Sequence, residues 1–244
     1  MPTSEPRPLE GALLPTLLTT GNLLCGFAAV VAAAHNRFGT AAALIFLGMA
    51  FDILDGQVAR WIGIATDFGI EYDSLADVIT FGLAPALLTV QYALDHFGRW
   101  GWVSGFLFVV GAALRLARFN IRATRASDTH FQGLPTPAAA GTLAALVLLF
   151  GPNQAPPEAG RVLLLLLPPG LAMLMVSTLP YRHVKHGRRG VGLLTWLIVG
   201  FAALLALIVA APRWVLPLLF GGYALSGPVA ALRRAWLRRR RPSS

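Results

Sequence analysis

The stretches DILDGQVAR at residues 52–60 and DFGIEYDSLAD at residues 67–77 contain six of the eleven acidic residues of this 244-residue chain. The sequence on either side is apolar: residues 38–51 and 78–94 contain no Asp, Glu, Lys or Arg. The acidic residues of the two stretches are Asp52, Asp55, Asp67, Glu71, Asp73 and Asp77. This pattern predicts two apolar helices that carry carboxylates at facing ends.

The composition of the whole chain agrees with apolar helices. Hydrophobic residues make up 56% and charged residues 13%, against about 45–50% and about 25% in soluble domains. One membrane-crossing helix needs about 20 mainly apolar residues, and the backbone in lipid must satisfy its own hydrogen bonds. We therefore predict an all-α polytopic membrane protein, not a soluble globule, with about eight transmembrane helices at roughly 14–34, 39–60, 72–94, 99–118, 135–151, 162–180, 191–211 and 214–232.

The distribution of basic residues predicts an orientation. With the N-terminus in the cytosol, only four of the 20 Lys and Arg residues face outward, namely Arg37, Arg99, Arg161 and Arg213, and the other sixteen face the cytosol. Basic residues accumulate in cytoplasmic loops. We expect one transmembrane domain over 1–244 in the cell (inner) membrane, with a catalytic core at about 14–180, further helices at about 191–232, and both termini in the cytosol. The net charge is +9, but the basic residues lie between apolar runs and form no patch suited to nucleic acid. The basic tail at 233–244 is expected to lie on anionic headgroups.

The spacing of four carboxylates indicates a shared site. Asp52 and Asp55 are three residues apart, and Asp73 and Asp77 are four apart, so each pair projects from one face of its helix. A short connection makes the two helices antiparallel neighbours, which brings the four groups together at the cytosolic end. Carboxylates at membrane depth usually mark a functional site, and hard oxygen ligands suit Mg²⁺, Mn²⁺ or Ca²⁺.

Small and basic neighbours add a place for a phosphate. Gly56 and Gly69 leave room for a ligand to approach the backbone, and Arg60 offers a guanidinium fork for phosphate oxygens. Taken singly, an Asp at a helix end can be a cap and an Arg can be an interfacial anchor. The whole constellation within apolar helices favours a functional site.

The pattern from Asp52 to Asp77, D-x-x-D-G-x-x-A-R, eight residues, G, three residues, D, three residues, D, resembles the signature of the CDP-alcohol phosphotransferases. The resemblance implies their fold and their reaction, transfer of a phosphoalcohol or phosphatidyl group from a CDP-linked donor to an alcohol with release of CMP. It also implies a homodimer.

Further stretches resemble the phosphatidylserine synthase branch of that family. They are LTTGNLLCGF at 18–27, DSLADV at 73–78 with FGLAPA at 81–86, ALRLARFN at 113–120 and FQGLPTPAAA at 131–140. Tyr72 stands where an aliphatic residue is usual, and Thr16 where asparagine is expected. This resemblance implies CDP-diacylglycerol as donor and L-serine as acceptor.

The resemblance also implies residue roles. Two divalent cations, Mg²⁺ or Mn²⁺, would be held by Asp52 and Asp73 together, with Asp55 on one ion and Asp77 on the other. Asp77 would also be the general base. The residues expected to hold the CDP part of the donor are Thr19, Asn22, Gly56, Arg60 and Thr66.

For the acceptor, we expect the serine carboxylate to meet Arg115, Arg118 and Asn120, with residues 133–135 as a wall; for each arginine, interfacial anchoring is an equal alternative. The same chemistry with another alcohol, such as glycerol 3-phosphate or inositol, remains open. A transporter that relays ions through buried acids and a non-catalytic scaffold are the remaining alternatives.

Overall fold

The computed structural model describes residues 8–63, 66–123, 133–179 and 211–239, and these residues form helices and short connections without any strand. The predicted all-α class is confirmed. The principal helices are α1 (Pro8–Ala34), α2 (Phe38–Ile62), α3 (Asp67–Asp77), α5 (Arg99–Ala123), α6 (Thr136–Phe150), α7 (Glu158–Val176) and α9 (Pro212–Arg239).

The helix that begins as α3 continues past Asp77 with changes in its winding. The π-helical segment η1 (Val78–Leu83) is followed by α4 (Ala84–Thr89), a second π segment η2 (Val90–Leu94) and the 3₁₀ turn η3 (Asp95–Phe97). Segments of π-helix are rare and are often found at functional sites. The first of them begins at the residue after Asp77, one of the predicted site carboxylates.

Six helical stretches of the described residues are long and apolar enough to cross a membrane: Leu13–Ala34, Phe38–Ile62, Asp67–Phe97, Arg99–Ile121, Glu158–Val176 and Pro212–Ala231. The predicted span at 135–151 corresponds to α6, which has only 15 residues. The predicted span at 191–211 lies outside the described residues. The predicted count of about eight is therefore approximate. Several helices extend beyond their predicted spans: α1 begins at Pro8 instead of residue 14, α3 begins at Asp67 instead of residue 72, α5 continues to Ala123 instead of residue 118, and α9 continues to Arg239, into the predicted tail.

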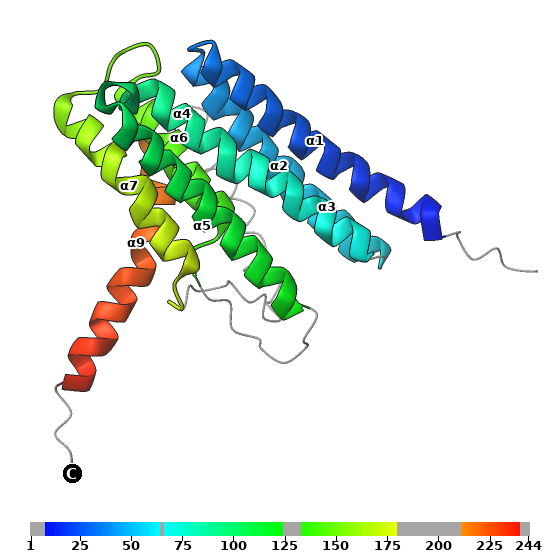
Figure 1. Ribbon diagram of the computed structural model, residues 1–244. Helices are drawn as coiled ribbons and strands as arrows, with labels where there is room; N and C mark the ends of the chain where they lie inside the picture. Colours follow the sequence, from blue (N-terminus) through cyan, green and yellow to red (C-terminus); the bar gives the residue numbers. More distant parts are fainter. Residues whose placement is uncertain (1–7, 64–65, 124–132, 180–210, 240–244) are drawn as a thin grey trace, which may run out of the picture.

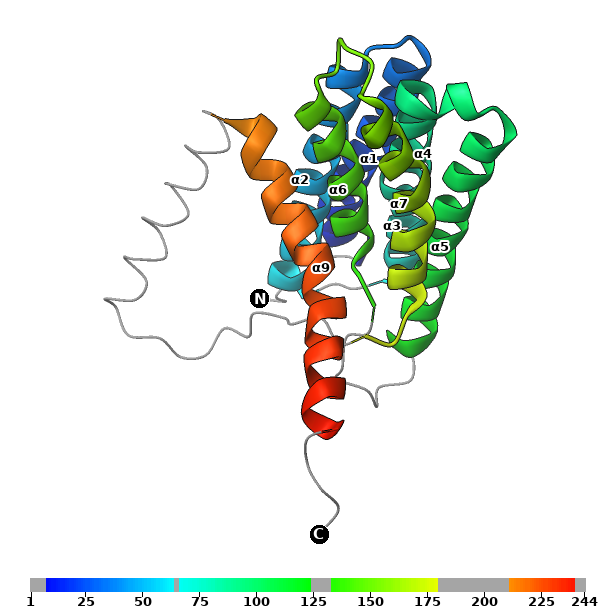
Figure 2. The ribbon, with the colours of Figure 1, turned by 90° about the vertical axis from the view of Figure 1, so that its left-hand side faces the viewer.

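The helices alternate in direction. Figures 1 and 2 show the α1–α2, η3–α5 and α6–α7 connections at one end of the bundle and the C-terminal ends of α2, α5, α7 and α9 at the other. In the two views α1 runs along α2, and α5 runs along α7. Because α3 starts at the end where α2 stops, the two acidic stretches meet at that end, as predicted.

Small residues let α1 and α2 approach the π segment. A Cβ at Gly48 would lie 2.6 Å from the methyl carbon of Thr80, and a Cβ at Gly26 would overlap the Thr80 side chain. Close backbone approach at small residues is a common basis of helix packing in membranes. The Thr80 hydroxyl donates a 3.0 Å hydrogen bond to the carbonyl oxygen of Asn22. This packing places the buried Asn22 side chain against the helix that carries Asp77.

Candidate metal and nucleotide site

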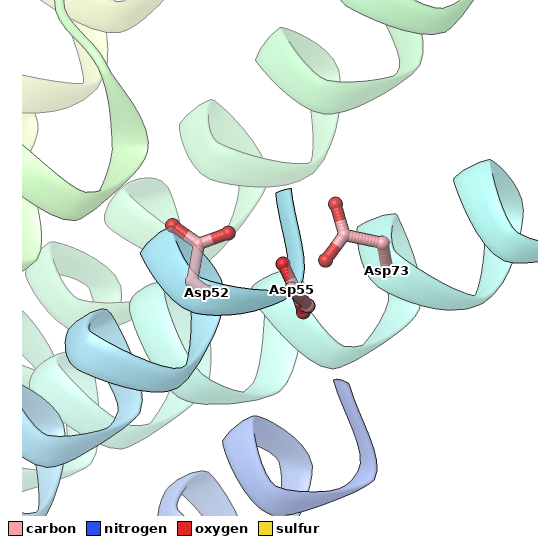
Figure 3. A group of neighbouring side chains, drawn as sticks. All are labelled: Asp52, Asp55 and Asp73. Atoms are coloured by element: carbon pink, nitrogen blue, oxygen red, sulfur yellow. The ribbon is translucent and has the colours of Figure 1, made fainter. Parts of the chain in front are cut away.

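Three carboxylates gather where α2 meets α3. Asp52 and Asp55 project from α2 and Asp73 projects from α3 toward the same space (Figure 3). One oxygen from each lies within 4.8 Å of the others. Asp55 is buried, and Asp52 and Asp73 are half-buried. Like charges in this setting repel strongly, so the cluster needs compensation by positive charge.

The donor set fits a hard divalent cation. The three groups supply only oxygen ligands, the type that Mg²⁺ and Mn²⁺ prefer. Within the described part of the chain, the buried Oδ1 of Asp73 accepts no hydrogen bond, although buried polar atoms are nearly always paired. An unpaired carboxylate oxygen that faces two other carboxylates is the arrangement expected of a ligand atom. Asp52, Asp55 and Asp73 therefore have the chemistry of a site for a divalent metal ion.

Asp77, the fourth carboxylate, is buried and only 7% exposed. The side-chain amide of Asn22 donates a 3.0 Å hydrogen bond to its Oδ1, and Asn22 is fully buried. Asp77 interacts electrostatically with Asp52 and Asp73, although it is not one of the three groups whose oxygens lie within 4.8 Å. The bond to Asn22 fixes the orientation of the Asp77 carboxylate.

Helix α1 supplies a second polar contact. The hydroxyl of Thr19 is placed 2.9 Å from Oδ2 of Asp55 and 3.1 Å from the carbonyl oxygen of Pro15. Thr19 and Asn22 are three residues apart, so they share one face of α1, and each contacts a different carboxylate. The resemblance assigned both residues to the CDP-linked donor; in the structure they contact the acids directly.

A pocket opens beside the cluster, between α1, α2 and α3. Its cavity volume is about 240 Å³, a little below the range of about 300–1,000 Å³ typical of small-ligand sites. Asp55 and Asp73 form part of both the pocket wall and the carboxylate cluster. The full lining is Pro15, Thr16, Thr19, Asp55, Gly56, Ala59, Arg60, Thr66, Gly69, Ile70, Tyr72 and Asp73.

Four of the five residues expected to hold the CDP part line this pocket: Thr19, Gly56, Arg60 and Thr66. A Cβ at Gly56 would lie 3.5 Å from a terminal guanidinium nitrogen of Arg60, an ordinary contact distance, so the two residues are neighbours on the pocket wall. The hydroxyl of Thr66 accepts a 3.0 Å hydrogen bond from the backbone N–H of Gly69. Thr66 is thus the N-cap of α3 and positions the start of that helix.

Arg115, one of the three expected acceptor residues, interacts with two carboxylates of the site. Its guanidinium is buried, donates a 2.7 Å hydrogen bond to the hydroxyl of Thr136, and interacts electrostatically with Asp77 and Asp52. Thr136 opens α6, directly after the expected wall at 133–135. The extended segment there is held by a 2.9 Å bond from the Gly133 N–H to a carbonyl oxygen beyond the end of α7. A buried cation therefore lies close enough to Asp77 and Asp52 to interact with their charges.

Arg118 and Asn120 occupy different surroundings. Arg118 donates a 2.9 Å hydrogen bond to the carbonyl oxygen of Val176 at the end of α7. The Asn120 amide donates to the Ser74 hydroxyl at 3.0 Å and to Glu71 at 3.2 Å, which ties α5 to α3 beside Asp73. The contact of Ser74 with Asn120 was not predicted from the sequence. The position of Ser74 next to Asp73 was the only available signal.

The structure thus combines long apolar helices, a carboxylate cluster suited to divalent cations and an adjoining pocket that contains an arginine. The chain belongs to the CDP-alcohol phosphatidyltransferase family, whose family model matches residues 12–220.

Curated relatives point to one branch of this family. The chain is 35% identical to the CDP-diacylglycerol–serine O-phosphatidyltransferase of Helicobacter pylori strain J99 over 88% of this chain and 89% of the relative. It is 33% identical to the protein of the same name from Bacillus subtilis, over 70% of this chain and 91% of that protein. An archaetidylserine synthase of Methanothermobacter thermautotrophicus is 34% identical over 70% of each. These comparisons confirm the family that the signature predicted.

Proposed function

We propose that this protein is a CDP-diacylglycerol:L-serine O-phosphatidyltransferase, which makes phosphatidylserine and CMP. The observation that carries the proposal is the position of Asp55 and Asp73, which belong both to a carboxylate cluster suited to cations and to the wall of a pocket that also contains Arg60. The names of the bacterial relatives support serine as the acceptor. The archaeal relative is also named for a serine product.

The pocket accounts for binding of the CDP-linked donor. Arg60 supplies a positive charge for phosphate oxygens, and Gly56 and Gly69 keep the wall free of side chains. Thr19 and Thr66 add hydroxyl groups, and Asn22 supports the site through Asp77. The diphosphate would lie beside Asp55 and Asp73, where divalent cations held by the carboxylates would neutralise its charge.

The carboxylates have separate tasks in the transfer. Asp52, Asp55, Asp73 and Asp77 would hold two divalent cations, Mg²⁺ or Mn²⁺, which when bound neutralise the diphosphate and stabilise the departing CMP. Asp77 accepts the proton of the serine hydroxyl as the hydroxyl oxygen bonds to the phosphorus that bears diacylglycerol. The bond from that phosphorus to the CMP oxygen breaks. Asn22 keeps the Asp77 carboxylate oriented throughout.

The acceptor site is proposed around Arg115. Its buried guanidinium interacts electrostatically with Asp77 and Asp52, so a serine carboxylate held there would place the serine hydroxyl near the base. Arg118 bonds the end of α7, and Asn120 bonds Ser74 on α3. Both would line the path by which serine enters from the membrane surface. Burial strengthens the attraction between a guanidinium and a carboxylate.

We also propose the cellular arrangement. The positive-inside rule supports a multi-pass protein of the cell (inner) membrane with both termini and the active site in the cytosol. There the site meets soluble serine while CDP-diacylglycerol remains in the lipid. Family resemblance supports a homodimer, which crosslinking in membranes tests.

An acceptor panel tests the proposed function. Purified protein receives CDP-diacylglycerol, Mn²⁺ and one candidate alcohol, and CMP release is measured together with the lipid product. We expect product from serine, and none from glycerol 3-phosphate or inositol. Product from glycerol 3-phosphate instead of serine would show that glycerol 3-phosphate is the acceptor. If no alcohol gives product, the proposed enzymatic activity is wrong.

A further inference from the structure

One wall of the pocket is aromatic. Tyr72 lines the pocket on α3 directly before Asp73. Its ring stacks on that of Phe68, four residues earlier on the same helix, with centroids 5.8 Å apart and an interplanar angle of 8°. Because adjacent helical residues point in different directions, Asp73 faces Asp52 and Asp55 while Tyr72 faces α1. The roles derived so far use Asp73 and leave Tyr72 unexplained.

A hydrogen bond to α1 holds the Tyr72 side chain. Its hydroxyl lies 3.1 Å from the hydroxyl oxygen of Thr20, and the Thr20 hydroxyl itself donates to the carbonyl oxygen of Thr16 at 2.7 Å. A threonine hydroxyl has only one hydrogen to donate. Tyr72 is therefore the donor and Thr20 the acceptor. The ring is fixed at its tip by α1 and on its face by Phe68.

The lining of the pocket is of two chemical kinds. Asp55, Asp73 and the guanidinium of Arg60 suit cations and phosphate oxygens. The remaining wall includes Pro15, Ile70 and Tyr72, which present apolar and aromatic surface. A nucleotide has the same division: charged phosphates at one end and a flat base, with apolar faces, at the other. Bases stack readily on aromatic side chains.

We propose that Tyr72 contacts the pyrimidine base of the CDP-linked donor, with Thr20 and Phe68 as positioning residues for its ring. This inference rests on the proposed function for the identity of the donor and adds to it the residue that binds the base. Tyr72 provides the flat surface, and its hydrogen bond to Thr20 holds that surface next to α1. The base would therefore lie between α1 and α3.

The test is CMP binding to the full-length protein in lipid nanodiscs with Mn²⁺, followed by calorimetry. Tyr72→Leu keeps apolar volume and removes the ring, and we expect roughly tenfold weaker CMP binding, the scale of one lost base–aromatic contact. Tyr72→Phe and Thr20→Val keep the ring and remove the hydrogen bond between the Tyr72 and Thr20 hydroxyls. Each is expected to weaken CMP binding about two- to threefold, a smaller effect than loss of the ring itself. Tyr92→Phe is the matched control, since the Tyr92 hydroxyl bonds the carbonyl oxygen of Gly151 at the opposite end of the bundle and its loss should leave CMP binding unchanged.

A second ligand separates a base contact from a general change of shape. Ribose 5-phosphate has the sugar and phosphate without the base, so Tyr72→Leu should bind it as the wild type does. Equal losses for both ligands, or unchanged CMP binding in Tyr72→Leu, would overturn the proposal. If Tyr72→Leu does not fold, unchanged CMP binding in both Tyr72→Phe and Thr20→Val would overturn it. CMP binding needs no acceptor, so failure of serine as a substrate is detected separately, by the acceptor panel.

Discussion

The amide of Asn22 on α1 donates a 3.0 Å hydrogen bond to Oδ1 of Asp77 on α3, and both side chains are buried. This bond links the first helix of the chain to the carboxylate that we propose as the base. An anchored carboxylate keeps its second oxygen directed toward one place, which a general base requires. The contact depends on the close packing of α1, α2 and the π segment around Thr80.

Replacing Asn22 by alanine should therefore act on turnover. We expect Asn22→Ala to lower kcat by about 10- to 100-fold, the usual range for partners that orient a reacting or ligating group, while Mn²⁺ still binds. Steady-state CMP release and Mn²⁺ titration check this. Asn153→Ala, in the α6–α7 connection, is the control and should keep full turnover. An Asn22→Ala enzyme with wild-type kcat would contradict the role of the bond.

Removal of a single cluster carboxylate should abolish the metal site. In Asp73→Asn the unpaired oxygen ligand becomes part of a neutral amide, so we expect Mn²⁺ affinity to fall by at least about a hundredfold and CMP release to fall with it. Electron paramagnetic resonance of free Mn²⁺ gives the affinity. Asp95→Asn, an exposed acid at the opposite end of the bundle, should change neither quantity. Strong Mn²⁺ binding by Asp73→Asn would exclude Asp73 as a ligand.

The buried Arg115 should govern serine more than the CDP-linked donor. Lysine in its place keeps the charge but loses the fork that binds a carboxylate. We expect Arg115→Lys to raise the KM for serine about tenfold, equivalent to about 1.4 kcal/mol, with little change in the KM for CDP-diacylglycerol. Arg161→Ala, in the first turn of α7, is the control. A rise confined to the lipid KM would move Arg115 to the donor site.

Arg118 provides a graded comparison. Its guanidinium bonds the end of α7 instead of the α6 start, so we expect Arg118→Ala to raise the serine KM by less than Arg115→Lys does. An unchanged serine KM in Arg118→Ala would leave Arg118 as a helix-end contact and an interfacial anchor, and would remove it from the acceptor site. Steady-state kinetics at saturating CDP-diacylglycerol provides this measurement.

The glycine contacts under the site should matter for stability. A valine at Gly48 would collide with Thr80 and press on Asn22, and overpacking of this kind costs about 1–3 kcal/mol. We expect Gly48→Val to unfold at a lower temperature and to lose turnover. Gly221→Val, on α9, meets nothing within 4 Å and is the matched control. Equal unfolding temperatures for the two variants would show that the contact around Thr80 is not tight.

The sequence predicted those parts of the fold and site that depend on local periodicity. Asp52 and Asp55 share a helical face because they are three residues apart, and Asp73 meets them because a short connection folds α3 back on α2. Contacts between helices distant in sequence depend on how each helix is rotated. The pairing of Thr20 with Tyr72 therefore could not be predicted, and no spacing rule gives the bond between Arg115 and Thr136.

Some helix boundaries differ from the predicted ones. Asp67 to Tyr72 are too polar for a membrane span, so hydropathy placed the helix start at residue 72, whereas the Thr66 cap starts α3 at Asp67. The predicted span in α9 ended at residue 232 because arginines end the apolar run there. Arginine nevertheless favours helix, and α9 continues to Arg239.

Serine labelled with ¹⁸O in its hydroxyl tests the central claim most directly. The full-length protein receives the labelled serine, CDP-diacylglycerol and Mn²⁺, and mass spectrometry follows the label. Attack of the hydroxyl oxygen on the phosphorus that bears diacylglycerol predicts that the label is retained in phosphatidylserine, that CMP is unlabelled, and that Asp77→Asn forms neither product. Absence of a labelled lipid, or its formation at the wild-type rate by Asp77→Asn, would contradict the account.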